Sequence, residues 1–369
     1  MNKHWEYRKI GDVCVVERGG SPRPIDKFIT EDEKGINWIK IGDTSDSMYI
    51  TETAQKIIPE GMKKSRYVQP GDFLLSNSMS FGRPYILKID GCIHDGWLVL
   101  RDEKKLFDKR FLYYYLSSKT TYEKFKSMAV GGVVNNLNSE MVRKVDVPVP
   151  SKEEQGDIAN LLDKLKSVID NRKHELQLLD DLIKARFVEL FGNPDLARAK
   201  PDWKPISSIG TVVGGATPKT NIDEYWDGEY RWITPAELDT ASWYIYDSVR
   251  KLTEAGVKSC SLTEMPVNTV ILSSRAPIGK VAIAGNTFYC NQGFKNIICG
   301  DTVHPVFLYA LLVMNNDYLN SLGRGATFKE ISKSIVENIK IPVPPYAEQE
   351  VFADFCSRVD KSKFINEVA

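Results

Sequence analysis

Two loops of this 369-residue chain place a small hydroxyl and a cation on a glycine-rich turn. They are Gly19-Gly20-Ser21-Pro22-Arg23 and Gly215-Ala216-Thr217-Pro218-Lys219. Glycine lets a backbone approach closely, a Ser or Thr hydroxyl can bond a phosphate oxygen, and Arg or Lys can neutralise its charge. A plain hairpin turn with a solvated cation is the alternative. We take Ser21, Arg23, Thr217 and Lys219 as candidate phosphate contacts.

A second pair of polar loops follows two apolar runs that read as strands. Ser76-Asn77-Ser78 leads to Gly82-Arg83, and Ser273-Ser274-Arg275 leads to Gly279-Lys280. Asn can pair with adenine and Arg with guanine in the major groove of DNA, whereas structural turn residues are the alternative. The candidates for contact with bases are Ser76, Asn77, Ser78, Arg83, Ser274, Arg275 and Lys280.

Further cations are candidates for contact with a nucleic-acid backbone. Lys63-Lys64-Ser65-Arg66 is the densest cationic run of the first half. A charge run is more often a solvated face, so this indication is weak. Lys295, Arg324 and Lys329 complete the set of candidates.

Groups that could do catalysis or hold a metal do not converge. The six cysteines form no CxxC pair and the four histidines share no ligand spacing with them, so we expect no metal site and buried, reduced thiols. There is no GxxxxGK[ST] phosphate loop. An adenine methyltransferase needs an Asn/Asp-Pro-Pro-aromatic loop, and Asn193-Pro194-Asp195-Leu196 lacks the second proline and the aromatic residue. We expect no catalytic residue.

The composition is that of a soluble globular protein. It is 42% hydrophobic and 27% charged, with a net charge of zero, so uniform basicity does not point to nucleic acid. Zero net charge does not exclude DNA binding, since the local field governs contact with phosphates. No window approaches the roughly 18 apolar residues of a membrane span, and the first residues lack the apolar core of a secretory signal. The length predicts two or three domains.

The chain repeats itself once. Gly131–Leu137 precedes Val145-Asp146-Val147-Pro148-Val149-Pro150, and Gly325–Ile331 precedes Ile339-Lys340-Ile341-Pro342-Val343-Pro344. Ile331 lies 194 residues after Leu137, and Glu348-Gln349 follows Glu154-Gln155 by the same interval. Upstream, Trp38-Ile39 resembles Trp232-Ile233 with small changes in spacing. Ordered matches of this kind indicate a tandem duplication of whole domains.

Each copy is predicted to be α+β with a β-rich core. Short apolar runs bounded by Gly, Pro and Asp, such as Val13–Val16, Phe73–Leu75 and Trp97–Leu100, are typical of strands. One helix is expected around Lys109–Ser127, with a counterpart near Pro305–Leu322.

A long helix is predicted between the copies. Ser151 and Glu154 form a capping box at its start, and Phe191-Gly192-Asn193-Pro194 ends it. Gaps of four and three residues alternate, with polar Arg172 and Arg186 in the series, as in a coiled coil; an amphipathic helix on one domain is the alternative. The predicted apolar seam is Ile158, Leu162, Leu165, Ile169, Leu176, Leu179, Ile183 and Leu190.

The second copy begins the same seam at Phe352, Cys356 and Val359. Since the sequence ends at Ala369, we expect a shortened second helix that pairs antiparallel with part of the first. Leu176, Leu179 and Ile183 are then expected to need another partner. The predicted domains are 1–150 and 198–345, with helices over 151–197 and 346–369.

Two similar domains on a rigid spacer suit a molecule that reads two DNA sites at a fixed separation. The chain resembles the specificity subunit of Type I restriction–modification enzymes over nearly its whole length. The resemblance rests on the Pro-Val-Pro and Glu-Gln junction of each copy, on the helix exit at Phe191–Pro194, and on the half-repeat of recognition domain plus helix.

The resemblance implies a cytoplasmic, non-catalytic subunit that reads a split, asymmetric DNA target. It implies two methyltransferase subunits and two motor-nuclease subunits as partners, which carry S-adenosylmethionine, ATP and Mg²⁺. The shortened second helix departs from the family pattern. A DNA methyltransferase or nuclease with fused recognition domains, and a scaffold that never meets DNA, are the alternatives.

Overall fold

The computed structural model describes residues 5–77, 81–129, 136–238, 243–275, 277–324 and 329–368, with side chains to Asp360. The chain divides into two compact units, Met1–Asp170 and Asn171–Ala369. Ser78 and most of the two Gly-rich junctions, Gly131–Asn135 and Gly325–Phe328, lie outside the described residues.

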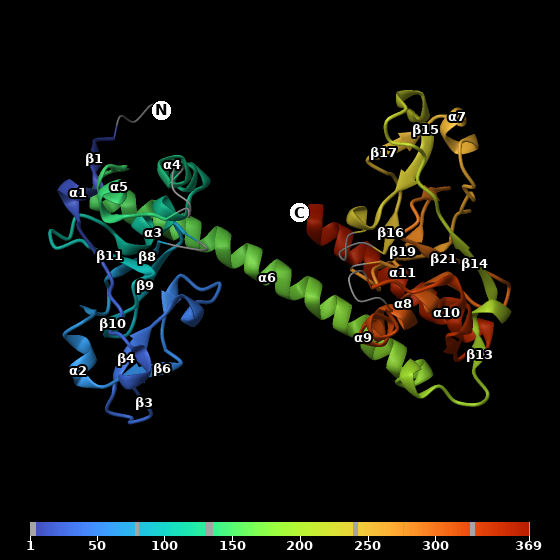
Figure 1. The fold of residues 1–369 in the computed structure, drawn as a ribbon, viewed down its shortest axis with the longest axis horizontal. Helices are drawn as coiled ribbons and strands as arrows, with labels where there is room; N and C mark the ends of the chain where they lie inside the picture. Colours follow the sequence, from blue (N-terminus) through green and yellow to red (C-terminus); the bar gives the residue numbers. More distant parts are fainter. Residues whose placement is uncertain are drawn as a thin grey trace. The chain divides into compact units, whose positions relative to one another are not determined.

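Both units are built on a five-stranded sheet of the same topology (Figure 1). The order is β2-β11-β8-β9-β5 in unit 1 and β14-β21-β18-β19-β16 in unit 2. Only the last pair of each sheet is parallel. The bounds are β2 Val15–Arg18, β11 Trp97–Arg101, β8 Phe73–Ser76, β9 Pro84–Leu87, β5 Tyr49–Ile50, β14 Gly210–Gly214, β21 Lys295–Cys299, β18 Val270–Leu272, β19 Val281–Ala284 and β16 Tyr244–Ile245.

A second sheet packs beside the first in each unit. Its order is β3-β6-β4-β10-β7 in unit 1 and β17-β15-β20 in unit 2, and each contains one parallel pair. The bounds are β3 Ile29–Thr30, β6 Gln55–Ile57, β4 Ile36–Ile39, β10 Gly91–Ile93, β7 Arg66–Val68, β17 Arg250–Leu252, β15 Trp226–Ile233 and β20 Tyr289–Cys290. A short ladder joins the ends of each recognition domain: β1 Tyr7–Lys9 with β12 Asp146–Pro148, and β13 Lys204–Pro205 with β22 Lys340–Ile341.

The central strands show why these runs form sheets with two covered faces. Phe73 and Leu75 of β8 belong to one apolar cluster and Leu74 to another. In β18, Val270 and Leu272 likewise belong to one apolar cluster and Ile271 to another. Alternation along a strand sends successive side chains to opposite faces, so a continuous apolar run requires a strand that is buried on both sides. The predicted α+β duplication is confirmed.

The expected single helix after the sheet is two helices in each copy, which corrects the sequence prediction. Unit 1 has α3 Lys109–Ser117 and α4 Lys119–Ala129, and unit 2 has α8 Pro305–Met314 and α9 Asn316–Ser321. Ser118 is extended, and its hydroxyl accepts from the Thr121 amide at 3.3 Å. Ser competes for backbone hydrogen bonds in this way and so interrupts a helical pattern. Shorter helices are α1 Ile10–Val13, α2 Pro59–Met62, α5 Ser139–Arg143, α7 Glu254–Lys258 and α10 Lys333–Asn338.

The long helix α6 spans Lys152–Phe191 and begins as predicted. The Ser151 hydroxyl accepts from the Glu154 amide, and the Glu154 carboxylate accepts from the Ser151 amide, both at 3.2 Å. Helix α6 ends just before Gly192, whose φ of +77° is a left-handed conformation that favours glycine.

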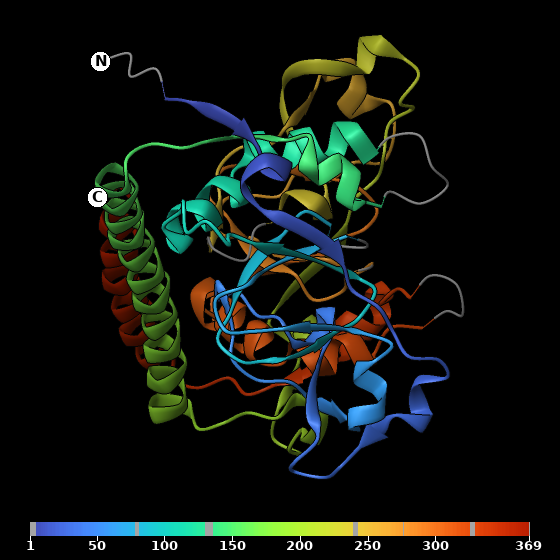
Figure 2. The ribbon, with the colours of Figure 1, turned by 90° about the vertical axis from the view of Figure 1, so that its left-hand side faces the viewer.

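In unit 2, the last part of α6 lies antiparallel to α11 Tyr346–Val368 (Figures 1 and 2). Phe187 and Phe191 both pack on Phe352, with ring centroids 5.3 and 5.7 Å apart, and Arg186 lies over the ring of Phe355. Phe352, Cys356 and Val359 are buried there.

The additional partner expected for Leu179 and Ile183 is α8 of the same unit. Ile183 is 5% exposed and Leu179 packs against the same core, because α8 and α11 both cover this face of α6. Phe187, which the predicted seam omitted, stacks on Phe307 of α8 at 5.4 Å. In unit 1, Ile158 packs on the core, whereas Leu165 and Ile169 are 51% and 54% exposed.

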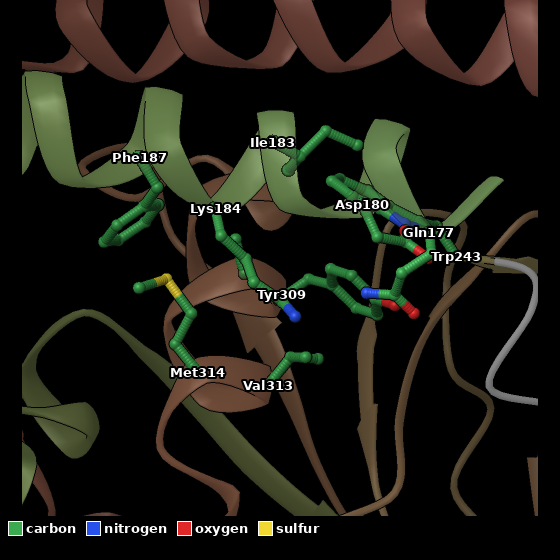
Figure 3. A pocket seen from close by; sticks show the side chains of 10 residues that line it. Gln177, Asp180, Ile183, Lys184, Phe187, Trp243, Tyr309, Val313 and Met314 are labelled. Carbon is green, nitrogen blue, oxygen red and sulfur yellow. The ribbon is translucent and has the colours of Figure 1, made fainter. Parts of the chain in front are cut away.

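A cavity of about 190 Å³ lies between α6 and α8 in unit 2 (Figure 3). Phe187 and Ile183 of α6 line it together with Trp243 and Tyr309. No described helix is both long and apolar enough to cross a bilayer. None of the six cysteines, which all lie in the described ranges, forms a disulfide, and the described residues include no group of three or more metal-ligating side chains.

Candidate nucleic-acid interface

Three segments of unit 1 meet at the end of the main sheet. They are the glycine loop, the end of β8, and the turn His94–Gly96 before β11. The Gly20 amide donates to the Ile93 carbonyl at 3.1 Å, and the Asn77 amide to the Gly96 carbonyl at 3.0 Å. The Asn77 carbonyl accepts from the Leu137 amide at 3.0 Å, which brings in the polypeptide after the Gly-rich junction.

The same three hydrogen bonds occur at the equivalent positions of unit 2. The Ala216 amide donates to the Cys290 carbonyl at 3.0 Å, and the Ser274 amide to the Gly293 carbonyl at 2.7 Å. The Ser274 carbonyl accepts from the Ile331 amide at 2.9 Å. Ser21 and Thr217 therefore occupy equivalent positions, as do Arg23 and Lys219. Loops held on a rigid sheet are where proteins commonly place binding residues.

The glycines of these loops serve the fold itself. A Cβ on Gly19 would lie 2.2 Å from the His94 carbonyl oxygen, and one on Gly215 would lie 2.1 Å from that of Cys290. Close approach between two backbone segments therefore explains why both loops have glycine here, and no phosphate contact is needed to explain it.

The two hydroxyls make equivalent internal hydrogen bonds. Ser21 Oγ donates to Asp95 Oδ1 at 2.8 Å, and Thr217 Oγ1 is hydrogen-bonded to Gln292 Oε1. Asp95 and Gln292 stand at matching positions in the turn. Contact of either hydroxyl with a phosphate therefore competes with a bond that the fold already makes.

The neighbouring cations are open to solvent. The Arg23 side chain is 82% exposed and touches Asp95 only at 3.4 Å, while Lys219 is exposed. Burial alone would raise the pKa of the Asp95 carboxyl, but the hydrogen bond from Ser21 and the charges of His94 and Arg23 hold it below its usual value. An exposed pair of this kind holds Arg23 weakly, so its guanidinium can turn to a phosphate.

Four base-contact candidates are buried or hydrogen-bonded within the protein. Ser76, Asn77 and Ser274 are 1%, 2% and 0% exposed. Asn77 Nδ2 donates to the Asp95 carbonyl at 2.8 Å, and Lys280 Nζ to the Leu238 carbonyl at 3.0 Å. Buried polar groups are normally satisfied within the protein, and these side chains hold the loops in place.

The candidates near the second junction form an ion cluster. Glu330 pairs with Arg275 at 3.0 Å and with Lys295 at 3.3 Å. Burial raises the pKa of the Glu330 carboxyl, but hydrogen bonds from the two cations outweigh it and lower that pKa overall. Arg324 and Lys329 are exposed on either side of residues 325–328.

Among the remaining cationic candidates of unit 1, the Lys63–Arg66 run lies beside the glycine loop, where Ser65 Oγ donates to the Ile93 carbonyl at 2.9 Å. Arg66 pairs with Glu17 at 3.1 Å, and Lys64 lies over the ring of Phe28. Lys63 is exposed. Arg83 is exposed and lines a separate cavity with Lys119 and Tyr122.

Sequence reasoning missed the residues behind the glycine loop of unit 1. A cavity of about 510 Å³ is lined there by Ser21, Arg23, Trp38, Lys40, Gln55, His94 and Asp95, with Pro22, Ile25, Asp26 and Ile29. His94 Nδ1 accepts from the Gly96 amide at 2.8 Å, and Lys40 Nζ donates to Gln55 Oε1 at 2.8 Å. Burial lowers the pKa of His94. Lys40 directly follows the repeated Trp-Ile pair, which was the available sequence signal.

The family model of the Type I restriction modification DNA specificity domain matches residues 2–180 and 201–368. A relative, the MjaIX specificity subunit of a Type I restriction enzyme from Methanocaldococcus jannaschii, is 42% identical over 184 residues. That match spans less than half of either chain, 48% of this one and 43% of the relative. The putative MjaX specificity subunit of the same organism is 26% identical across 96% of this chain and 87% of its own length.

The fold also has a counterpart among solved structures. The S subunit of a Type I restriction–modification system from M. genitalium aligns over 99% of this chain and 92% of its own, with a TM-score of 0.58 at 15% identity. Both halves of the chain match the family model, so the chain belongs to the Type I restriction modification DNA specificity family and carries its domain twice in tandem.

Proposed function

We propose that this chain is the non-catalytic, sequence-reading subunit of a cytoplasmic Type I restriction–modification complex. Each unit reads one half of a split DNA target. One observation carries the proposal: the two units share a hydrogen-bonding framework at the glycine loop but differ in the side chains on it. Asp95 in one turn and Gln292 in the other are an example. Different side chains on the same backbone framework imply that the two units read different half-sites, and the target is then asymmetric.

The catalytic steps belong to partners in this proposal. Two methyltransferase subunits bind S-adenosylmethionine and methylate adenine, and two motor-nuclease subunits use ATP and Mg²⁺. This chain binds none of these cofactors. Its contribution is to position double-stranded DNA, with phosphates held by exposed cations such as Arg23 and Lys219 and bases read by neighbouring side chains.

Co-expression with a Type I methyltransferase subunit, followed by modification-sensitive sequencing of the host DNA, tests the proposal. The expected result is a stable complex and adenine methylation in two short, dissimilar blocks separated by a fixed spacer. Methylation by the chain purified alone would favour a methyltransferase with fused recognition domains. A complex that neither binds nor modifies DNA would favour a scaffold.

A further inference from the structure

The cavity behind the glycine loop of unit 1 has a counterpart in unit 2 that can be located from strand register. Trp38 of β4 pairs with Gln55 on one side and with Cys92 on the other. Trp232 of β15 pairs with Arg250 and Tyr289 in the same way. Counting from these anchors, Gln55 corresponds to Arg250, Lys40 to Thr234, and His94 to Asn291.

The backbone contacts at these positions are the same in both units. The His94 amide donates to the Ile39 carbonyl at 3.2 Å, and the Asn291 amide to the Ile233 carbonyl at 3.1 Å. His94 Nδ1 and Asn291 Oδ1 each accept from the glycine amide two residues on, both at 2.8 Å.

The polar head groups differ at the same positions. Lys40 bonds to Gln55 in unit 1. In unit 2, Thr234 bonds to Glu237, and the Arg250 guanidinium stacks 3.4 Å over the Trp226 ring. Contacts with phosphates carry no sequence information, so two units that read different bases must differ in the side chains that meet the bases. Different polar groups at equivalent positions of one backbone framework fit this requirement.

The unit 1 pair offers hydrogen-bond donors. An ammonium group has no acceptor, so Lys40 must donate to Gln55 Oε1, and this fixes the orientation of the Gln55 amide. Gln55 Nε2 then supplies donors, and Lys40 Nζ has further N–H groups. A free glutamine suits adenine because it both donates and accepts, whereas here the bond from Lys40 already occupies one lone pair of the Gln55 carbonyl oxygen and adds further donors.

We propose that the Lys40–Gln55 pair reads a G·C base pair in the first half-site. Guanine shows two acceptors, O6 and N7, in the major groove, which complement the donors of Lys40 and Gln55. Cytosine shows the N4 amino donor, and Asp26, a residue that lines the same cavity, carries a carboxylate that can accept from it. Asp95, the other lining carboxylate, is engaged by Ser21 and Arg23. This inference rests on the proposed function and assigns one base pair to one site.

The test uses the full chain copurified with its methyltransferase subunit and a pool of randomised duplex DNA. Wild type is compared with Lys40→Met and Gln55→Glu, the second of which replaces donors with acceptors at constant shape. Each variant is expected to lose the preference for G·C at one position of one half-site by roughly 5- to 150-fold, the usual worth of a bidentate base contact. The other half-site stays unchanged and reports that the protein is folded.

Lys56→Gln is the matched control. It removes a cation from the next residue of β6, whose side chain points to the opposite face and donates to the Glu33 carbonyl. An unchanged preference in both pocket variants would overturn the inference. So would uniform weakening on all sequences, which indicates a phosphate contact, or a change at a position that is not G·C. Recovery of no motif by wild type would instead refute the proposed function itself.

Discussion

The side-chain oxygen of Gln155, near the start of α6, accepts a hydrogen bond from the Asp108 amide at 2.7 Å. Its amide nitrogen donates to the carbonyls of Leu106 and Pro150 at 3.0 and 2.9 Å. In unit 2, Gln349 makes the same three bonds, to the His304 amide and to the carbonyls of Thr302 and Pro344. Both glutamines are fully buried. Each therefore fixes a spacer helix to the end of the recognition domain before it.

Gln155→Leu is expected to destabilise the chain by about 1–3 kcal/mol, because three backbone groups in buried or part-buried hydrogen bonds lose their partner. Urea unfolding of the full chain measures the loss. Gln177→Leu, at an exposed position of the same helix, is the control and should stay within about 0.5 kcal/mol of wild type. Equal stability of both variants would show that the buried glutamine does not secure α6.

Phe187→Ala is expected to cost about 3–5 kcal/mol, because its fully buried ring contacts α8 and α11 at once. Leu165→Ala, on an exposed part of α6, is expected to leave unfolding nearly unchanged. Denaturant unfolding with hydrogen exchange on α8 and α11 distinguishes the two. A large effect of Leu165→Ala would mean that α6 has a covering partner in the free chain.

The sequence predicted the duplication because fixed-interval matches survive wherever both copies need the same buried contacts, as at Gln155 and Gln349. The seam was only partly predictable. Heptad spacing selected Leu165, which is exposed, and omitted Phe187, because the period alone does not reveal which neighbour covers a helix. Asn77 is typical of a loop, and only the fold shows that it is buried. Lys40 and Gln55 lie 15 residues apart and meet through strand pairing.

Protonation of His304 at low pH should lower the stability of unit 2. His304 Nδ1 accepts from the Val306 amide at 3.2 Å and caps α8, and burial lowers the pKa of His304 despite the charges of Glu350 and Asp354. The unfolded chain then takes up this proton first, so stability falls as pH drops below about 6.5 toward the lowered folded pKa. His304→Asn, which keeps a cap but does not titrate, should flatten this part of the pH profile of unfolding. An unchanged slope would contradict the capping role.

Arg23→Gln and Lys219→Gln test the equivalent exposed cations for contact with phosphates. Each is expected to lower the slope of log affinity against log salt by about 1 and to weaken binding to all sequences alike. Binding of random duplex DNA by the methyltransferase-bound chain at several salt concentrations measures the slope. A selective loss for one sequence would assign the residue to base reading instead.

The central claim is that each unit reads its own half of the target. The most direct measurement replaces residues 1–150 with the first recognition domain of another Type I specificity subunit and maps adenine methylation in cells that also express the methyltransferase. We expect one half of the motif to change while the other half and the spacer stay the same. Changes in both halves, or in neither, would contradict the claim.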